Sequence, residues 1–320
     1  MTRVLLQLTG GLGNQLFQLA AGLSLVSCEP NKLEIEEKLG RPRGTVEGTA
    51  DVLSFDWPEP FKIVPVRVGK LSNFMSRVTG YCLRLGVIPT KIESSKVIRE
   101  SIISIASLLL SLFLKERRKI FIGQGTGFTE LDRNLTAPYL VGYFQSYKYA
   151  ELSRSLLSMA KISKAGPELA FLESIAQVET PLVVHCRFGD YLQEEDFGIP
   201  SSKYYSSAIE KLLERNNFNC IWVFSDDLEK AKEKLLLGER LPVRWINSVD
   251  ASVTSTLQAM RLGHGYVVAN SSFSWWAAFL SVNSAAEVVA PSPWFKGMDD
   301  PKDLIPLNWH QVDAGYVHDR

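Results

Sequence analysis

The sequence has no excess of charge of either sign, and it has few cysteines. Its 35 Lys and Arg residues balance 35 Asp and Glu residues, which argues against a uniformly basic nucleic-acid binder. The four cysteines, at positions 28, 82, 186 and 220, are far apart and form no CxxC pair. We therefore expect reduced thiols in apolar surroundings, as in a protein of a reducing compartment.

No segment of membrane-spanning length interrupts the chain. Residues 102–114 carry no charge, but 13 helical residues span only about 20 Å of a hydrocarbon core that is about 30 Å thick. Serines at positions 101, 104, 107 and 111 recur at helical spacing, so this segment predicts either a helix packed in protein or an interfacial helix. A strand is expected directly at residues 4–8, with no signal peptide before it, which predicts a cytoplasmic protein.

Common catalytic motifs are also missing. There is no Asp-x-Asp triplet, and the four His residues, at 185, 264, 310 and 318, lack metal-ligand spacing. No Gly-x-Ser-x-Gly elbow and no Gly-Lys-Ser/Thr signature occur, which excludes a serine-hydrolase elbow and a P-loop. A site without metal and without a cofactor is therefore expected.

Regular alternation of strands and helices dominates the second half. Strands are expected at residues 182–185, 221–224, 243–246, 266–269 and 288–290, with helices at residues 201–215, 228–236, 253–262 and 273–282. Nearly continuous apolar strands separated by helices indicate a doubly wound parallel sheet. We expect a domain at residues 1–165 and a second at 166–320. Ligands of such sheets bind where the strands end, so the residues after each strand are the candidates.

A glycine-rich turn, GGLGNQ at residues 10–15, follows the first strand. Gly11 and Gly13 permit close approach of backbone N–H groups to an anion, and Asn14 and Gln15 open the following helix. Leu16 stands where the dinucleotide fingerprint needs a third glycine, so that fingerprint is not met. A sharp turn without a ligand is the alternative.

Charged residues follow two strands of the second half. His185 and Arg187 alternate along the first of them, and a guanidinium can grip two phosphate oxygens. Asp190 is close enough to fix Arg187 or to act as a general base. Asp226 and Asp227 follow the next strand, where either could contact a nucleoside and either could cap the next helix.

A strand-to-helix turn with an amide and hydroxyls comes later, and its members are Asn270, Ser271, Ser272 and Ser274. These groups suit a phosphate at a helix N-terminus. The aromatic residues that follow, Trp275, Trp276 and Phe279, are expected to pack in the core. Convergence of the four turns on one cleft would favour a nucleotide-diphosphate ligand between the domains.

Five of these segments together resemble glycosyltransferase family 11, the α-1,2-fucosyltransferase family. They are GGLGNQLFQ at 10–18, GYFQS at 142–146, HCRFGDY at 185–191, FSDD at 224–227 and NSSFSWW at 270–276. The resemblance implies a GT-B-like fold of two Rossmann-like domains facing a central cleft. It also implies GDP-fucose as donor, inversion, no metal, and an acceptor galactose or N-acetylgalactosamine with an attacking 2-hydroxyl.

The resemblance also implies residue roles. Arg187 would bind the β-phosphate, while His185 and one of Asp226 and Asp227 would contact guanosine. Ser271 and Ser272 would line the phosphates, and Asn14 and Gln15 would approach from the first domain. The chain departs from the family where a second Arg often stands, at Phe188, and where an acid often stands, at Thr256.

The acceptor's proton needs a base, and Asp190 is the first candidate, followed by Glu195 and its neighbours Glu194 and Asp196. Two other functions remain open: the same fold using another nucleotide sugar, and a non-catalytic nucleotide- or glycan-binding protein. The family's bacterial members often act on surface polysaccharide or lipid-linked oligosaccharide.

The balanced charge is unevenly distributed. Residues 61–120 hold 12 basic and 3 acidic residues, among them Lys70, Arg77, Arg84 and Lys91 at intervals of seven. Lys115, Arg117, Arg118 and Lys119 follow the uncharged segment. Residues 71–86 predict an amphipathic helix. This basic insert could dock on anionic lipid at the inner face of the cytoplasmic membrane, or it could be a solvated basic face.

Overall fold

The computed structural model describes residues 3–26, 29, 32–36, 51–57, 64–66, 78, 81, 93–112, 120–123, 126–131, 138–162, 165–189, 191, 196–247 and 252–316. Two compact units result. Unit 1 comprises Met1–Lys161 with Pro301–Leu304, and unit 2 comprises Ile162–Asp300 with Ile305–Arg320. Of the helix expected at 71–86, only residues 78 and 81 are described, and both are helical; the basic residues around them lie outside the described residues.

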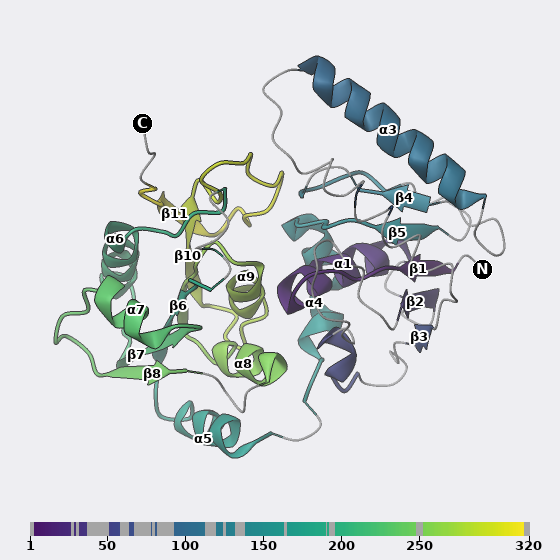
Figure 1. The fold of residues 1–320 in the computed structure, drawn as a ribbon. Coiled ribbons are helices and arrows are strands. Elements are labelled where there is room, and N and C mark those ends of the chain that lie inside the picture. Colours follow the sequence, from purple (N-terminus) through teal and green to yellow (C-terminus); the bar gives the residue numbers. More distant parts are fainter. Residues whose placement is uncertain are drawn as a thin grey trace. The chain divides into compact units, whose positions relative to one another are not determined.

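Unit 1 is built on a parallel sheet of five strands with the order β3-β2-β1-β5-β4. The strands are β1 (Val4–Leu6), β2 (Leu33–Glu36), β3 (Val64–Val66), β4 (Ile120–Ile122) and β5 (Tyr139–Val141). Its helices are α1 (Leu12–Leu25), the short 3-10 helix η2 (Asp51–Ser54), α3 (Glu93–Ser111) and α4 (Tyr147–Ser158). In Figure 1, α3 lies over β4, and α1 lies against α4.

Unit 2 contains a parallel sheet of six strands with the order β11-β10-β9-β6-β7-β8. The strands are β6 (Pro181–Cys186), β7 (Cys220–Ser225), β8 (Val243–Ile246), β9 (Gly265–Val267), β10 (Glu287–Ser292) and β11 (His310–Asp313). The helices are α5 (Pro167–Ile175), α6 (Ser202–Leu213), α7 (Leu228–Lys234), α8 (Val253–Met260) and α9 (Ser272–Phe279). Figure 1 shows α6 and α7 on one face of the sheet and α8 and α9 on the other, so the sheet is doubly wound.

The α/β class and the GT-B-like composition of two parallel-sheet units are confirmed. Every strand and helix expected in the second half is present within three residues of its predicted ends. The central cleft between the two domains stays a prediction, because each unit is described by itself.

The core of unit 2 is aliphatic around the strands and aromatic around α9. Val184, Val223 and Val267 are fully buried between the helical layers. Trp275 stacks on Phe279 with ring centroids 4.7 Å apart and also contacts Trp276. All three aromatic residues are buried, which confirms their expected place in the core. Among the described residues, no helix is both long enough and apolar enough to cross a membrane.

Candidate functional site

The strand order of unit 2 changes direction between two adjacent strands. From β6 the chain proceeds to β7 and β8 on one side, and then returns to β9 on the other side. At such a switch point the connections leave in opposite directions and open a crevice at the carboxyl ends of the strands. Arg187 follows β6, Asp226 follows β7, and Asn270 lies just beyond β9, so all three come to this edge of the sheet.

An ion pair joins two of these residues. Arg187 Nη1 lies 3.2 Å from Asp226 Oδ2, and Asp226 Oδ1 accepts a hydrogen bond of 2.9 Å from the backbone N–H of Phe188. The carboxylate is thus fixed by the same turn that carries the arginine. The Arg187 side chain remains 36% exposed, which leaves the guanidinium accessible to an anion.

Beside this pair lies Gly189, where there is no room for a side chain. A Cβ at Gly189 would lie 2.6 Å from Asp226 Oδ2 and 3.8 Å from Arg187 Cζ. Any larger residue at 189 would push the carboxylate away from its place. The glycine of the HCRFGDY segment therefore permits close approach of the Asp226 carboxylate.

His185 is held inside the sheet edge as a neutral imidazole. Burial, and secondarily the charge of Arg187, lowers the pKa of His185 to about 3. Its ring centroid lies 6.0 Å from that of Phe273, and its carbonyl accepts from the Tyr205 hydroxyl at 3.2 Å. Among the described residues, nothing hydrogen-bonds its buried Nδ1. A buried polar atom of this kind is a natural contact for a polar ligand group.

Asn270 ties the turn after β9 to Tyr191, Phe197 and Gly198, on either side of the candidate bases at residues 194–196. Its Nδ2 donates to the carbonyls of Phe197 and Gly198, at 2.8 and 3.0 Å, and its own carbonyl accepts from the Tyr191 hydroxyl at 3.1 Å. The Oδ1 atom is buried and unpaired in the described part of the chain. Asn270 therefore binds Tyr191, Phe197 and Gly198 to this turn and still presents one acceptor.

The remaining predicted groups of unit 2 mostly serve the helix ends. Asp227 caps α7 by accepting from Lys230 N at 3.1 Å, and its ion pair with Lys230 lowers its pKa. Between the two aspartates, the structure places Asp226 at Arg187 and Asp227 at the helix cap. The Asp227 carboxylate is thus occupied by the helix end.

The serines of the NSSFSWW segment divide in the same way. Ser271 caps α9 by accepting from Phe273 N, and Ser274 is fully buried, donating to the carbonyls of Ala269 and Ser271. Ser272 is half-buried at the first turn of α9. The hydroxyl of Ser274 is used inside the turn, so we assign it to holding the turn and not to contacting a ligand.

Both departures from the family pattern lie in ordered surroundings. Phe188 is 4% exposed and packs in the apolar core of unit 2. Thr256 donates its hydroxyl to the Ser252 carbonyl within α8, at 3.0 Å. Of the candidate bases, Asp190, Glu194 and Glu195 lie outside the described residues, while Asp196 is described and exposed.

Unit 1 has a switch point of its own, between β1 and β5. The glycine-rich turn follows β1, where Gly11 is the N-cap of α1 and a Cβ on it would meet nothing within 4 Å. Gln145 follows β5 and donates its Nε2 to Asn14 Oδ1 at 2.8 Å, and its own Oε1 is buried with no partner in the described residues. Gly13 is buried in the first turn of α1. This edge combines a helix N-terminus with two side-chain amides.

Gln15 points inward and not toward that edge. Its Nε2 donates to the Gly10 carbonyl at 2.9 Å and to Asp51 Oδ2 at 3.2 Å, and its Oε1 accepts from Val52 N at 3.0 Å. The residue is fully buried. Gln15 therefore fastens η2 to the turn, and its approach to a ligand stays a prediction.

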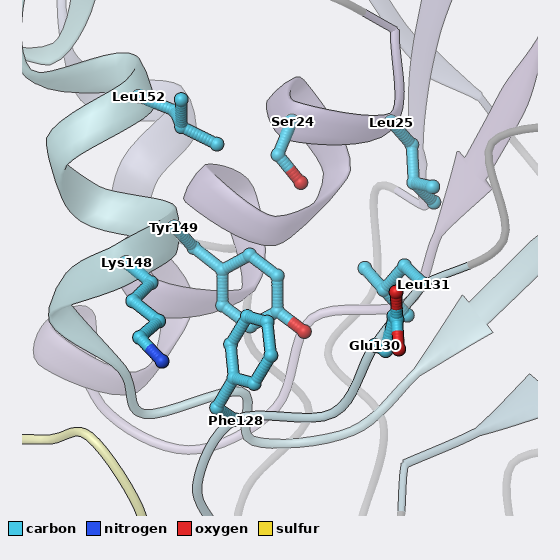
Figure 2. A pocket seen from close by; sticks show the side chains of 8 residues that line it. All are labelled: Ser24, Leu25, Phe128, Glu130, Leu131, Lys148, Tyr149 and Leu152. Carbon is cyan, nitrogen blue, oxygen red and sulfur yellow. The ribbon is translucent and has the colours of Figure 1, made fainter.

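A cavity of about 740 Å³ lies elsewhere in unit 1, along α1 and α4. Figure 2 shows its lining, which comprises Ser24, Leu25, Phe128, Glu130, Leu131, Lys148, Tyr149 and Leu152. Lys148 pairs with Asp303 at 2.8 Å, and the Tyr149 hydroxyl donates to the Thr129 carbonyl. The sequence-predicted residues do not line this cavity. In the described ranges, no group of three or more His, Cys, Asp or Glu side chains could hold a metal ion.

Comparison with known proteins gives a consistent family. A family model described as glycosyl transferase family 11 matches residues 88–310, more than half of the chain. An alpha-1,2-colitosyltransferase of Escherichia coli is 26% identical over 324 residues, which cover 98% of this chain and 100% of that protein. The O-antigen biosynthesis glycosyltransferase WbnK of Escherichia coli is 28% identical over 124 residues, covering 37% of this chain and 40% of that protein.

Solved structures are more distant. The crystal structure of the fucosyltransferase NodZ from Bradyrhizobium is 13% identical with a TM-score of 0.48, and the match covers 94% of this chain and 99% of that one. This score adds nothing to the fold described above. Because the family model matches more than half of the sequence, the chain belongs to glycosyltransferase family 11.

Proposed function

We propose that this glycosyltransferase transfers L-fucose, with inversion and without a metal ion, from GDP-fucose to the 2-hydroxyl of a galactose or N-acetylgalactosamine residue. The observation that carries the proposal is the Arg187–Asp226 pair at the switch point of unit 2. It offers a fixed, accessible guanidinium where a diphosphate would bind. Membership of family 11 and the 1,2-linkage in the relative's name support the reaction class.

In the proposed mechanism, Arg187 stabilises the charge that grows on the diphosphate as the bond to the sugar breaks. Because Asp226 and the Phe188 N–H already hold the turn, little reorganisation is needed when that charge appears. The neutral imidazole of His185 and the Oδ1 of Asn270 are the buried groups that we assign to polar contacts with the nucleotide. Asp190 remains the first candidate for the base that removes the acceptor proton, with Glu195 next.

One observation supports GDP-colitose as an alternative donor: the relative that aligns over its full length is named a colitosyltransferase. Colitose is fucose without its 3-hydroxyl. A site that hydrogen-bonds this hydroxyl discriminates strongly against a donor that lacks it, whereas a purely apolar pocket discriminates weakly. The choice between GDP-fucose and GDP-colitose is therefore a measurable property of this site.

For the acceptor, we propose a cell-surface polysaccharide or a lipid-linked oligosaccharide, and for the location the cytoplasm or the inner face of its membrane. The relative named for O-antigen biosynthesis supports an acceptor of this class.

The test is a donor panel followed by one pair of variants. The protein is incubated with a glycan acceptor array and, separately, GDP-fucose, GDP-colitose, GDP-mannose and UDP-galactose, and release of the diphosphate is measured. We expect GDP-fucose to be the best donor. Turnover with UDP-galactose alone would contradict the proposal, and tight GDP binding without turnover on any acceptor would identify a non-catalytic protein.

The variants are Arg187→Ala and the matched control Arg215→Ala. Arg215 also pairs with a carboxylate, Glu287, but at the end of α6 and the start of β10, the opposite edge of the sheet. We expect Arg187→Ala to lower kcat by roughly 100- to 1,000-fold and Arg215→Ala to leave it unchanged. Near-normal turnover of Arg187→Ala would refute the mechanism.

A further inference from the structure

Helix α3 of unit 1 has two apolar faces, one packed on the sheet and one exposed to solvent. Toward the sheet, α3 places Ile103, which is 2% exposed, in a cluster with Leu5, Ile120, Ile122, Tyr139 and Val141, and Ala106 packs against the same cluster. Contacts between α3 and β4 hold the helix on the sheet, as Figure 1 shows. This inner face explains why the helix is attached.

The outer face of α3 is a row of large aliphatic side chains in solvent. Its members are 46–72% exposed. They are Ile98, Ile102, Ile105, Leu108 and Leu109 on α3, and Leu112 directly after the last residue of the helix. At about 100° per residue they share an arc of roughly 120°, and from first to last they extend about 21 Å along the helix. The exposed Ser101 falls on the same arc. Even so, soluble surfaces rarely leave so many large aliphatic side chains together in solvent. We call these six residues the α3 apolar face.

The charge of the surrounding sequence indicates what covers this face. Residues 101–114 contain no charged residue, and four basic residues follow within residues 115–119. The wider segment, residues 61–120, holds 12 basic residues against 3 acidic ones. An apolar face on a helix embedded in basic sequence is the pattern of an interfacial helix on anionic lipid.

The residue types also favour lipid over protein. Protein interfaces rely on Trp, Tyr and Arg anchors that fill pockets. The α3 apolar face consists only of Ile and Leu, which suit acyl chains. We propose that this face docks on the surface of an anionic bilayer, with α3 lying in the plane of the membrane. The proposal does not depend on which sugar the enzyme transfers.

The test uses vesicle flotation of the full chain. Vesicles of phosphatidylcholine alone are compared with vesicles that also contain phosphatidylglycerol, at low and high salt. We expect binding to the anionic vesicles to exceed binding to the neutral ones by about ten-fold or more, and to weaken with salt. Absence of binding to the anionic vesicles would overturn the proposal.

A pair of triple variants assigns the binding to α3. In Ile102→Ser/Ile105→Ser/Leu109→Ser the apolar face is interrupted. The control Leu236→Ser/Val282→Ser/Leu307→Ser removes three aliphatic residues of unit 2 that are even more exposed, at 59–91%. We expect the first to lose vesicle binding by about ten-fold or more, because three aliphatic side chains that would be buried in the bilayer are removed, and the second to bind like the parent. Equal binding by the two variants would overturn the proposal.

Two further measurements distinguish docking on lipid through α3 from self-association of the chain. The emission spectrum of Leu109→Trp, after subtraction of the parent's spectrum, should shift to the blue on anionic vesicles. This measurement does not need the triple variant to fold, and the absence of a shift would contradict docking through α3. Sedimentation of the parent without vesicles should give a monomer. A dimer that the α3 triple variant dissociates would assign the face to a second copy of the chain and overturn the proposal.

Discussion

The Asp226 carboxylate grips Arg187 with one oxygen and the backbone of the arginine's own turn with the other. Its Oδ2 lies 3.2 Å from Arg187 Nη1, and its Oδ1 accepts from Phe188 N at 2.9 Å. A residue of one strand end thereby fixes both the position and the direction of a side chain on the neighbouring strand end. Asp226 is in this sense a positioning residue, and Arg187 is the group offered to the phosphate.

Replacing Asp226 should therefore affect the chemical step more than substrate capture. In Asp226→Asn the amide oxygen still accepts from Phe188 N, but the charge that orients Arg187 is lost. We expect kcat to fall by roughly 10- to 100-fold with a smaller change in the KM for the donor. Steady-state kinetics with a soluble acceptor measures both.

Two controls separate this role from a direct contact. Asp227→Asn keeps a good helix cap and should retain near-parental kcat. The double variant Arg187→Ala/Asp226→Asn should be no slower than Arg187→Ala alone, because Asp226 acts through the arginine. Additive losses would show that Asp226 touches the substrate independently.

Gly189→Ala should mimic the loss of Asp226 without touching either charged residue. The new Cβ would meet Asp226 Oδ2 at 2.6 Å, so the carboxylate must move away from Arg187. We expect kcat/KM to fall by about 10-fold with a melting temperature close to the parent's. Gly238→Ala, where a Cβ meets nothing within 4 Å, should change neither quantity.

His185 should make the fold sensitive to mild acid. Its pKa is lowered from 6.5 to about 3 in the folded state. Between these two pH values, His185 therefore binds a proton in the unfolded chain but not in the folded chain. The stability is fully present above pH 6.5 and is lost as the pH falls toward 3. Between about pH 7.5 and about pH 5 the loss should be about 2 kcal/mol.

Denaturant unfolding at the two pH values measures this loss, and His185→Asn provides the comparison. The variant should be less stable at both values because a buried side chain is changed, but its stability should depend less on pH. Equal pH dependence in the two proteins would contradict the neutral, buried imidazole.

Substitutions at Gln15 and at Asn14, both in the glycine-rich turn of unit 1, should lower the unfolding free energy by different amounts. Gln15→Leu leaves Val52 N–H without its acceptor and Asp51 without its donor, so we expect a loss of about 2 to 4 kcal/mol of unfolding free energy. Asn14→Ala loses only the contact with Gln145 and should cost about 1 kcal/mol. If Asn14 faces the substrate, Asn14→Ala should lose much of its activity while it stays nearly as stable as the parent. Unfolding curves and steady-state kinetics of both variants test this expectation.

The alternation of the second half was predictable because its strands are longer and its helices carry clear periods. Val243–Ile246 was placed correctly at both ends. The strands β4 and β5 were not predicted, although β1 and β9 are equally short, because no helical period stands between them in the sequence to mark a β/α alternation. Propensity cannot find strands that only their neighbours stabilise.

At the candidate site, the sequence could nominate residue types but not directions. Asp226 and Asp227 are identical and adjacent, and only the geometry after β7 sends one to Arg187 and the other to α7. Gln15 was expected to approach a ligand from the glycine-rich turn, whereas its partners Asp51 and Val52 lie 36 and 37 residues away in the sequence. Such long-range hydrogen bonds leave no local pattern to read.

The return of Pro301–Leu304 to unit 1 affects how this enzyme could be recombined with its relatives. Lys302 accepts from Phe128 N through its carbonyl at 3.0 Å, and Asp303 accepts from Tyr147 N at 2.8 Å and pairs with Lys148. A chimera that joins residues 1–161 to a foreign second half would sever these bonds at the start of α4. Exchange of unit 1 between relatives therefore requires two grafts, one at each crossing of the chain, rather than a single splice.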